Sequence, residues 1–209
     1  SVFAMPVYSR CITRYITDIP ILLTNAVLPQ SNVYGVLADE AGAFCKAAKK
    51  LYHAGRRDIA FVMDGETRSE RSKLDGYARA MAQCGLQLSI FRAERSVEGG
   101  RLAMEHILLE APDTDAVLFT EDTTAVGGLQ ALHSRGITVP DRMAVIGCNN
   151  SVYCSICSPQ LSSIDNSLHA TGRTAARQMI ALLNHEPDVE KSIRLPCSLV
   201  LRDTTPPML

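Results

Sequence analysis

The sequence carries almost no net charge and has no hydrophobic run of membrane-spanning length. Its 21 lysine and arginine residues balance 22 acidic residues, which leaves a net charge of −1. Surfaces that bind nucleic acid are usually strongly basic, so this segment is not expected to hold DNA by itself. A membrane-spanning helix needs about 20 consecutive apolar residues, and the sequence has no such run. We therefore predict a globular protein with no membrane partner.

The cysteines lack the features of a disulfide framework or a zinc motif. Their number is odd, the chain is not short, and several lie inside apolar runs, which is typical of reduced thiols in a cytoplasmic protein. The seven are Cys11, Cys45, Cys84, Cys148, Cys154, Cys157 and Cys197. Cys154 and Cys157 have redox or metal spacing, but no second close pair follows and the five histidines are scattered. We predict no metal site and favour a packed loop at Cys154–Cys157.

The sequence also lacks the signatures of common doubly wound enzymes. It has no dinucleotide fingerprint, no phosphate-binding glycine loop and no GxSxG elbow. Glu121 beside Asp122 has the composition of a general-acid pair, but no nucleophile or metal ligand set lies nearby. We therefore predict that the protein is not an enzyme and uses no cofactor.

What the sequence does contain is a regular alternation of short apolar runs and longer helical patterns. The runs predict strands over residues 21–23, 59–62, 88–91, 116–119, 143–146, 163–164 and 199–201. The helical spacing predicts helices over residues 39–54, 71–84, 100–109, 122–135 and 168–183. This alternation indicates an α/β fold in which helices cover both faces of parallel sheets.

Polar residues follow many of the predicted strands. The pairs and triplets are Thr24-Asn25, Asp64-Gly65, Thr120-Glu121-Asp122, Asn149-Asn150 and Asp165-Asn166. Ligands of open parallel sheets bind beyond the carboxyl ends of the strands. Amides and carboxylates in that place suit a polyhydroxylated small molecule. The alternative is that these residues only cap the helices that follow, and we expect Asp122 to cap the helix that begins there.

Six motifs in order resemble the lactose-repressor/galactose-repressor (LacI/GalR) family of bacterial transcription regulators. LYHAGRRDIA at 51–60 resembles that family's "L…GHRRIA", KLDGYARAM at 73–81 resembles "RL.GF..AL", and DAVLFTEDTTAVG at 115–127 resembles "DAVFaxNDxxAxG". GITVPDRMAVIGCNN at 136–150 resembles "GxxVPxDvsVvGfDD", SPQLSSIDN at 158–166 resembles "PxLTTvxQ", and LPCSLVLRDTT at 195–205 resembles "LPxxLvxRxST". Each motif is weak alone, but together they cover nearly the whole chain from Ile19.

The resemblance implies a two-lobed, periplasmic-binding-protein-like (type I) effector domain. It places residues 1–37 and 167–194 in a partial N-terminal lobe, and residues 38–166 and 195–209 in the C-terminal lobe. The crossings near Leu37, Ser167 and Arg194 are the expected hinges. The family's helix-turn-helix has no counterpart before Ser1, and the chain is expected to begin near the third strand of the N-terminal lobe, over residues 2–8.

At several positions that match the family's effector contacts, this sequence has a residue that differs from the usual one. Lys73 stands where the family usually has an arginine, so it keeps the cation but loses the planar, two-pronged guanidinium. Arg71, two residues earlier, is a candidate substitute. Glu121 stands where the family often has asparagine, next to the usual Asp122.

Amides replace other family residues at the same predicted edge. Asn149 and Asn150 replace a pair that is usually two aspartates or Asp-Asn, and Asn166 replaces a frequent glutamine. Asn25 follows the first predicted strand, and Arg95 falls near a position that is aromatic in some sugar-binding members. The predicted effector-binding set is Lys73, Arg71, Glu121, Asp122, Asn149, Asn166, Asn25 and Arg95.

This set predicts an effector that is a sugar or a sugar derivative. Neutral amides and added cations would match a carboxylate or phosphate on the ligand, whereas Glu121 argues against a strongly anionic one, so both remain open. Lys73 and Arg71 have the alternative of being solvated surface charges. By resemblance, the protein is a homodimeric, repressor-type regulator whose missing N-terminal segment binds operator DNA. The runner-up is an exported sugar-binding protein of a transporter, against which the seven cysteines argue.

Overall fold

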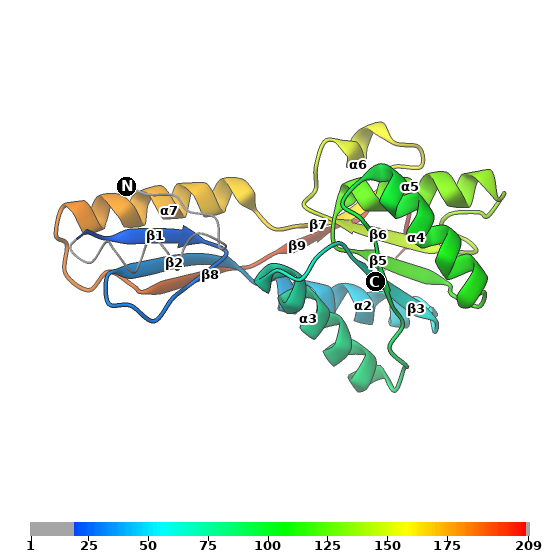
Figure 1. Cartoon of the computed structure of the whole chain (residues 1–209), viewed down its shortest axis with the longest axis horizontal. Coiled ribbons are helices and arrows are strands. Elements are labelled where there is room, and N and C mark those ends of the chain that lie inside the picture. The colour runs from blue at the N-terminus through cyan, green and yellow to red at the C-terminus, as the bar shows by residue number, and fades with distance from the viewer. Residues whose placement is uncertain (1–18, 208–209) are drawn as a thin grey trace. The chain divides into compact units, whose positions relative to one another are not determined.

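The structure is a computed structural model that describes residues 19–207, and these residues form two compact units. Unit 1 contains residues 19–39 and Ser167–Pro196, and unit 2 contains Glu40–Asn166 and residues 197–207. Figure 1 labels the elements of both units. The strand expected over residues 2–8 lies outside the described residues.

Unit 1 contains a three-stranded parallel sheet and one long helix within the described residues. The strands β1 (Ile21–Thr24), β2 (Val33–Ala38) and β8 (Ser192–Leu195) lie in the order β1-β2-β8. Helix α7 (Leu168–Leu183) packs along one face of this sheet (Figure 1), where Ala175 and Met179 contact Leu22 and Val36. Every second residue of β1 faces the helix because strand side chains alternate between the two faces of a sheet.

Unit 2 is built on a six-stranded sheet in the order β4-β3-β5-β6-β7-β9. All neighbouring pairs are parallel except β7 and β9, which are antiparallel. The strands are β3 (Ile59–Met63), β4 (Ile90–Arg92), β5 (Ala116–Phe119), β6 (Ala144–Cys148), β7 (Ser162–Asp165) and β9 (Ser198–Val200). The three central strands β3, β5 and β6 are buried along their whole length, as expected for strands with a helix layer on each face.

Helices cover both faces of the unit 2 sheet (Figure 1). Helices α2 (Glu40–His53) and α3 (Arg68–Cys84) pack on one face around Phe44, Phe61 and Tyr77. Helices α4 (Val97–Glu110) and α5 (Asp122–Ser134) pack on the other face around Met104 and Phe119. A short helix, α6 (Tyr153–Ile156), lies between β6 and β7 in the sequence. Of the described residues, none belongs to a helix long and apolar enough to traverse a bilayer.

The predicted α/β fold is confirmed, and every helix and strand predicted within residues 19–207 is present. Two helices begin three residues earlier than predicted because hydroxyl residues cap them: Thr67 accepts a hydrogen bond from the backbone of α3, and Ser96 does the same for α4. The sequence analysis missed β2, β8 and α6. Strand β8 alternates polar and apolar residues over only four positions, a pattern too short to stand out.

Candidate functional site

The candidate site lies at the carboxyl edge of the unit 2 sheet. Because neighbouring parallel strands end at the same edge, the polar residues that follow them are brought together. Asp64 follows β3, Arg95 follows β4 and Glu121 follows β5, while Asn149 follows β6 and Asn166 follows β7. We call these five residues the edge network, since hydrogen bonds and ion pairs connect them.

Arg95 and Asp64 form one end of the edge network. The Nε and Nη2 atoms of Arg95 donate to the two carboxylate oxygens of Asp64, over 3.1 and 2.9 Å. The Asp64 side chain is only 1% exposed, whereas that of Arg95 is 57% exposed. Arg95 Nη2 also lies 3.8 Å from Glu121 Oε1, so its charge is shared between two carboxylates. This two-pronged geometry is the strong form of a guanidinium–carboxylate pair.

Glu121, Asn149 and Asn166 form the other end. The amide nitrogen of Asn149 donates to Glu121 Oε2, and the amide nitrogen of Asn166 donates to Asn149 Oδ1 over 2.7 Å. Burial raises the pKa of Glu121, although Lys73 and Arg95 oppose that shift. Asn149 has a φ of 98°, a left-handed conformation that asparagine tolerates better than most residues. Asn149 therefore turns the chain sharply after β6 and links the ends of β5, β6 and β7.

Lys73 lies beneath the edge network and is almost completely buried. Its Nζ donates to Glu70 Oε1 over 2.9 Å and to the carbonyl oxygen of Thr120 over 3.0 Å, and lies 3.9 Å from Glu40 Oε1. Burial alone would lower the pKa of Lys73, but the negative field around it, to which Glu70 and Glu40 contribute, raises it overall. Burial also raises the pKa of the nearby Cys148 thiol, which stays protonated at neutral pH. Lys73 thus directs its charge toward groups of the protein.

Two further residues of the predicted set, Arg71 and Asn25, have contacts that do not involve the edge network. Arg71 is 69% exposed and pairs with Glu66 over 3.8 Å. Asn25 belongs to unit 1, where its Oδ1 accepts a hydrogen bond from the backbone of Ala38. Asn150, which follows Asn149 but is not in the predicted set, accepts a hydrogen bond at its Oδ1 from Arg202 Nη2 over 2.7 Å. The structure therefore brings together Arg95, Glu121, Asn149 and Asn166 from the predicted set.

The prediction that Asp122 caps helix α5 is wrong. Glu121 occupies the cap position and Asp122 is the first helical residue. The two carboxylate oxygens of Asp122 instead accept from the hydroxyl of Ser163 and the backbone of Ser151, each over 2.7 Å. Asp122 therefore joins the start of α5 to β7 and to the loop after β6, which fixes the position of Glu121 beside it.

Sequence reasoning missed the partners that decide where the cations lie. Asp64 was recognised as a strand-end residue but was not included in the predicted site, although it pairs directly with Arg95. Glu70 precedes Lys73 by three residues on α3, a spacing that places two side chains on the same side of a helix and could have indicated the pair. Glu40 lies on another helix, and no local pattern links it to Lys73.

The cysteine pair at α6, formed by Cys154 on the helix and Cys157 at its C-cap, is held by burial and hydrogen bonds. Cys154 is fully buried, and burial raises the pKa of its thiol to about 12. The Cys157 thiol donates to the carbonyl oxygens of Pro159 and Cys154 over 3.3 and 3.7 Å. Within residues 19–207, no three His, Cys, Asp or Glu side chains are placed to bind a metal ion.

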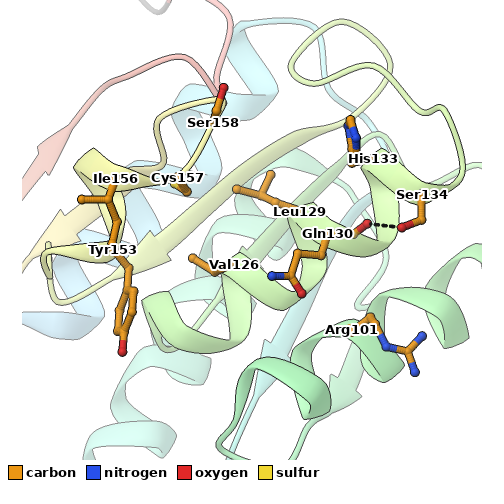
Figure 2. A pocket seen from close by; sticks show the side chains of 10 residues that line it. All are labelled: Arg101, Val126, Leu129, Gln130, His133, Ser134, Tyr153, Ile156, Cys157 and Ser158. Atoms are coloured by element: carbon orange, nitrogen blue, oxygen red, sulfur yellow. Dashed lines mark hydrogen bonds between the residues drawn. The ribbon is translucent and has the colours of Figure 1, made fainter.

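Unit 2 also has a pocket of about 590 Å³, and none of its lining residues belongs to the edge network. Figure 2 shows its lining, which α5 and α6 mainly supply. The lining residues are Arg101, Val126, Leu129, Gln130, His133, Ser134, Tyr153, Ile156, Cys157 and Ser158. Val152 and Ile156 are each 68% exposed, so α6 presents apolar side chains beside this pocket.

Comparison with known proteins places the chain in a family. The model of the periplasmic binding protein-like domain matches residues 48–205. An HTH-type transcriptional regulator of Lachnoclostridium phytofermentans is 28% identical over 90% of this chain and 57% of its own length. The regulator AscG of Escherichia coli (strain K12) is 32% identical over 69% of this chain and 44% of its own length. The chain thus spans about half the length of these two relatives.

A solved structure agrees with these matches. A LacI family transcriptional regulator from Arthrobacter sp. FB24, in complex with lactose, is 26% identical and has a TM-score of 0.87. The likeness covers 99% of this chain and 79% of that one. The predicted resemblance and the two-lobed fold type are confirmed. The chain therefore belongs to the periplasmic binding protein-like domain family, and it is similar to transcriptional regulators that include members of the LacI family.

Proposed function

We propose that this chain is the effector-sensing part of a sugar-responsive transcriptional regulator, and that the edge network contributes to its effector site. The observation that carries this proposal is the continuous chain of hydrogen bonds and ion pairs from Asp64 to Asn166 at the carboxyl edge of the sheet. Such an edge is where ligands bind in open α/β sheets. The lactose complex named above supports a sugar as the effector class.

The effector would act by favouring one of two conformations of the regulator. It can shift that equilibrium only by its difference in affinity for the two states, and a coupling of about 1–3 kcal/mol is typical. Operator DNA would be bound by a helix-turn-helix segment outside the present sequence, in the cytoplasm, most simply as a repressor. The transporter alternative loses support because the relatives are transcriptional regulators.

The Asn149→Gly variant should lose effector affinity by about tenfold, the equivalent of one hydrogen bond. Glycine accepts the left-handed backbone of this position, so the substitution removes the amide without straining the turn. Without the amide, Glu121 and Asn166 are no longer linked and the edge network is divided. Titration calorimetry with ribose, lactose and cellobiose, on wild type and variant, measures the loss.

Asn184→Ala serves as the matched control, because Asn184 is an exposed amide at the end of α7. Its affinity for the same sugars should equal that of the wild type. Equal affinity of the Asn149→Gly variant and the wild type would exclude the edge network from the effector site.

We further propose that the regulator is a homodimer and that α6 and the pocket beside it contribute to the interface. The support is the exposed apolar surface of Val152, Tyr153 and Ile156, next to a pocket that Val126 and Leu129 line. Exposed apolar patches on soluble proteins commonly mark protein–protein contacts.

The Ile156→Asp variant should weaken dimerisation at least about tenfold, since a charge would have to be buried in an apolar contact. Sedimentation velocity over a concentration series measures the dimer dissociation constant. Leu109→Asp is the control, because Leu109 is 79% exposed and does not line the pocket. A dimer that tolerates Ile156→Asp but is lost with Leu109→Asp would place the interface on another face.

A further inference from the structure

The cations at the carboxyl edge of unit 2 are already neutralised by groups of the protein. Lys73 is 3% exposed and its ammonium group contacts Glu70, while Glu40 lies 3.9 Å away. The guanidinium of Arg95 is held by both oxygens of Asp64 and lies near Glu121. The carboxylates of Glu40, Asp64, Glu70 and Glu121 thus outnumber these two cations, and the region carries an excess of negative charge.

The hydrogen bonds of the edge network leave one buried acceptor without a donor among the described residues. The amide nitrogens of Asn149 and Asn166 and the ammonium of Lys73 all donate to protein oxygens. By contrast, the Oδ1 atom of Asn166 is buried and accepts no hydrogen bond from any described residue. Asn166 is only 5% exposed, and its nitrogen donates to Asn149, so its amide belongs to the edge network. An unpartnered buried acceptor is costly unless a ligand or water donates to it.

We propose that the edge network selects a ligand that supplies hydrogen-bond donors and a positive charge, which means a hydroxylated compound with a protonated amine, such as an amino sugar. This inference rests on the effector-sensing role proposed above. The sequence left open whether the effector is neutral or anionic. The inference argues against an anionic effector, because the carboxylates in excess at this edge would repel sugar acids and sugar phosphates.

Glu121 is the residue expected to contact the amine. Its Oε2 accepts from Asn149, whereas among residues 19–207 its Oε1 has only the 3.8 Å approach of Arg95. An ammonium group has three donors and no acceptor, so it suits a carboxylate such as Glu121, while the hydroxyl groups of the same ligand can donate to acceptors such as Oδ1 of Asn166. A hydroxyl and an ammonium can both donate to the Glu121 carboxylate, but the ammonium adds the attraction between opposite charges, which gives the amine an advantage over a hydroxyl.

The test is a titration of the purified protein with matched carbohydrates at neutral pH. Glucosamine, glucose and glucuronate form one series, and galactosamine, galactose and galacturonate form a second. We expect the amine of a binding series to bind about tenfold more tightly than the neutral sugar. The acid of that series should bind more weakly than the neutral sugar.

Two variants identify the group responsible for the preference. In Glu121→Gln, the side-chain oxygen can still accept from Asn149, but the charge is lost, so the amine and the neutral sugar should bind equally. Glu98→Gln removes an exposed carboxylate that pairs with Arg101 on α4, and the preference should persist. Circular dichroism confirms that each variant is folded.

The outcomes separate the two proposals. Binding of neutral sugars with no preference for the amine, or tighter binding of the acid, overturns the inference and leaves the sensing role intact. An amine preference that persists in Glu121→Gln also overturns it. If no member of either series binds, and ribose, lactose and cellobiose do not bind either, both the inference and the proposed function are rejected.

Discussion

Replacing Lys73 with methionine is expected to lower the free energy of unfolding by about 3–5 kcal/mol, although methionine keeps a long and flexible side chain. Glu70 and Glu40 are both buried, and in the wild type the ammonium of Lys73 lies within 4 Å of each. The variant removes this cation, and the loss arises because two buried carboxylates then lack its compensating charge. The carbonyl oxygen of Thr120 would also lose its donor, which now lies 3.0 Å away. Thr120 immediately precedes Glu121, so the variant would also lose a hydrogen bond that fixes the backbone next to the edge network.

Urea denaturation followed by far-ultraviolet circular dichroism measures the change, since the sequence has no tryptophan for fluorescence. Lys46→Met is the matched control: Lys46 is exposed on α2, and its loss should change the free energy by no more than about 0.5 kcal/mol. Similar values for the two variants would mean that the buried ion pairs contribute little.

The pH dependence provides a second readout of the same substitution. Because the pKa of Lys73 is raised in the folded protein, the folded state holds this proton more tightly than the unfolded state does. The stabilisation is fully present below the ordinary lysine pKa of about 10.4. It is lost as the pH rises above that value. The wild type should therefore lose stability in alkaline solution faster than Lys73→Met does.

The edge of the sheet could be predicted from the sequence, whereas the direction of the side chains on it could not. Strand ends are visible because an apolar run stops at a polar residue, and parallel pairing places such ends together. Glu121, Asn149 and Asn166 were found in this way. The burial of Lys73 depends on Glu40, a residue of another helix, so no local pattern could reveal it.

Competition between hydrogen-bond partners explains the error at Asp122. A carboxylate at a helix start usually caps it, but Ser163 and the backbone of Ser151 come from segments distant in sequence and engage both oxygens. Strand β2 (Val33–Ala38) is almost wholly apolar, but the sequence analysis did not predict it. Gly35 interrupts its apolar run, and a glycine inside such a run weakens the indication of a strand. In both cases the deciding information is tertiary.

Gly127→Ala is expected to destabilise unit 2 by about 3 kcal/mol, at the upper end of the usual cost of overpacking. Gly127 lies on α5 where α4 passes closest to it. A methyl group there would collide with the backbone carbonyl of Val97 and would lie 2.7 Å from the backbone nitrogen of Arg101. Both obstacles are main-chain atoms, so neither can move without displacing α4.

Helix propensity alone predicts that Gly127→Ala stabilises the protein, whereas the close packing of α4 and α5 predicts destabilisation. The comparison with Gly172→Ala, where only helix propensity acts, separates the two. Alanine is preferred to glycine in a helix by about 0.5–1 kcal/mol. Gly172 lies on α7 with nothing within 4 Å of an added methyl group, so there the substitution should stabilise the protein by that amount. Hydrogen exchange followed by mass spectrometry reports each effect in its own unit, with faster exchange expected in α4 and α5 of Gly127→Ala and slower exchange in α7 of Gly172→Ala. Slower exchange in both variants would mean that α4 and α5 lie further apart than this structure places them.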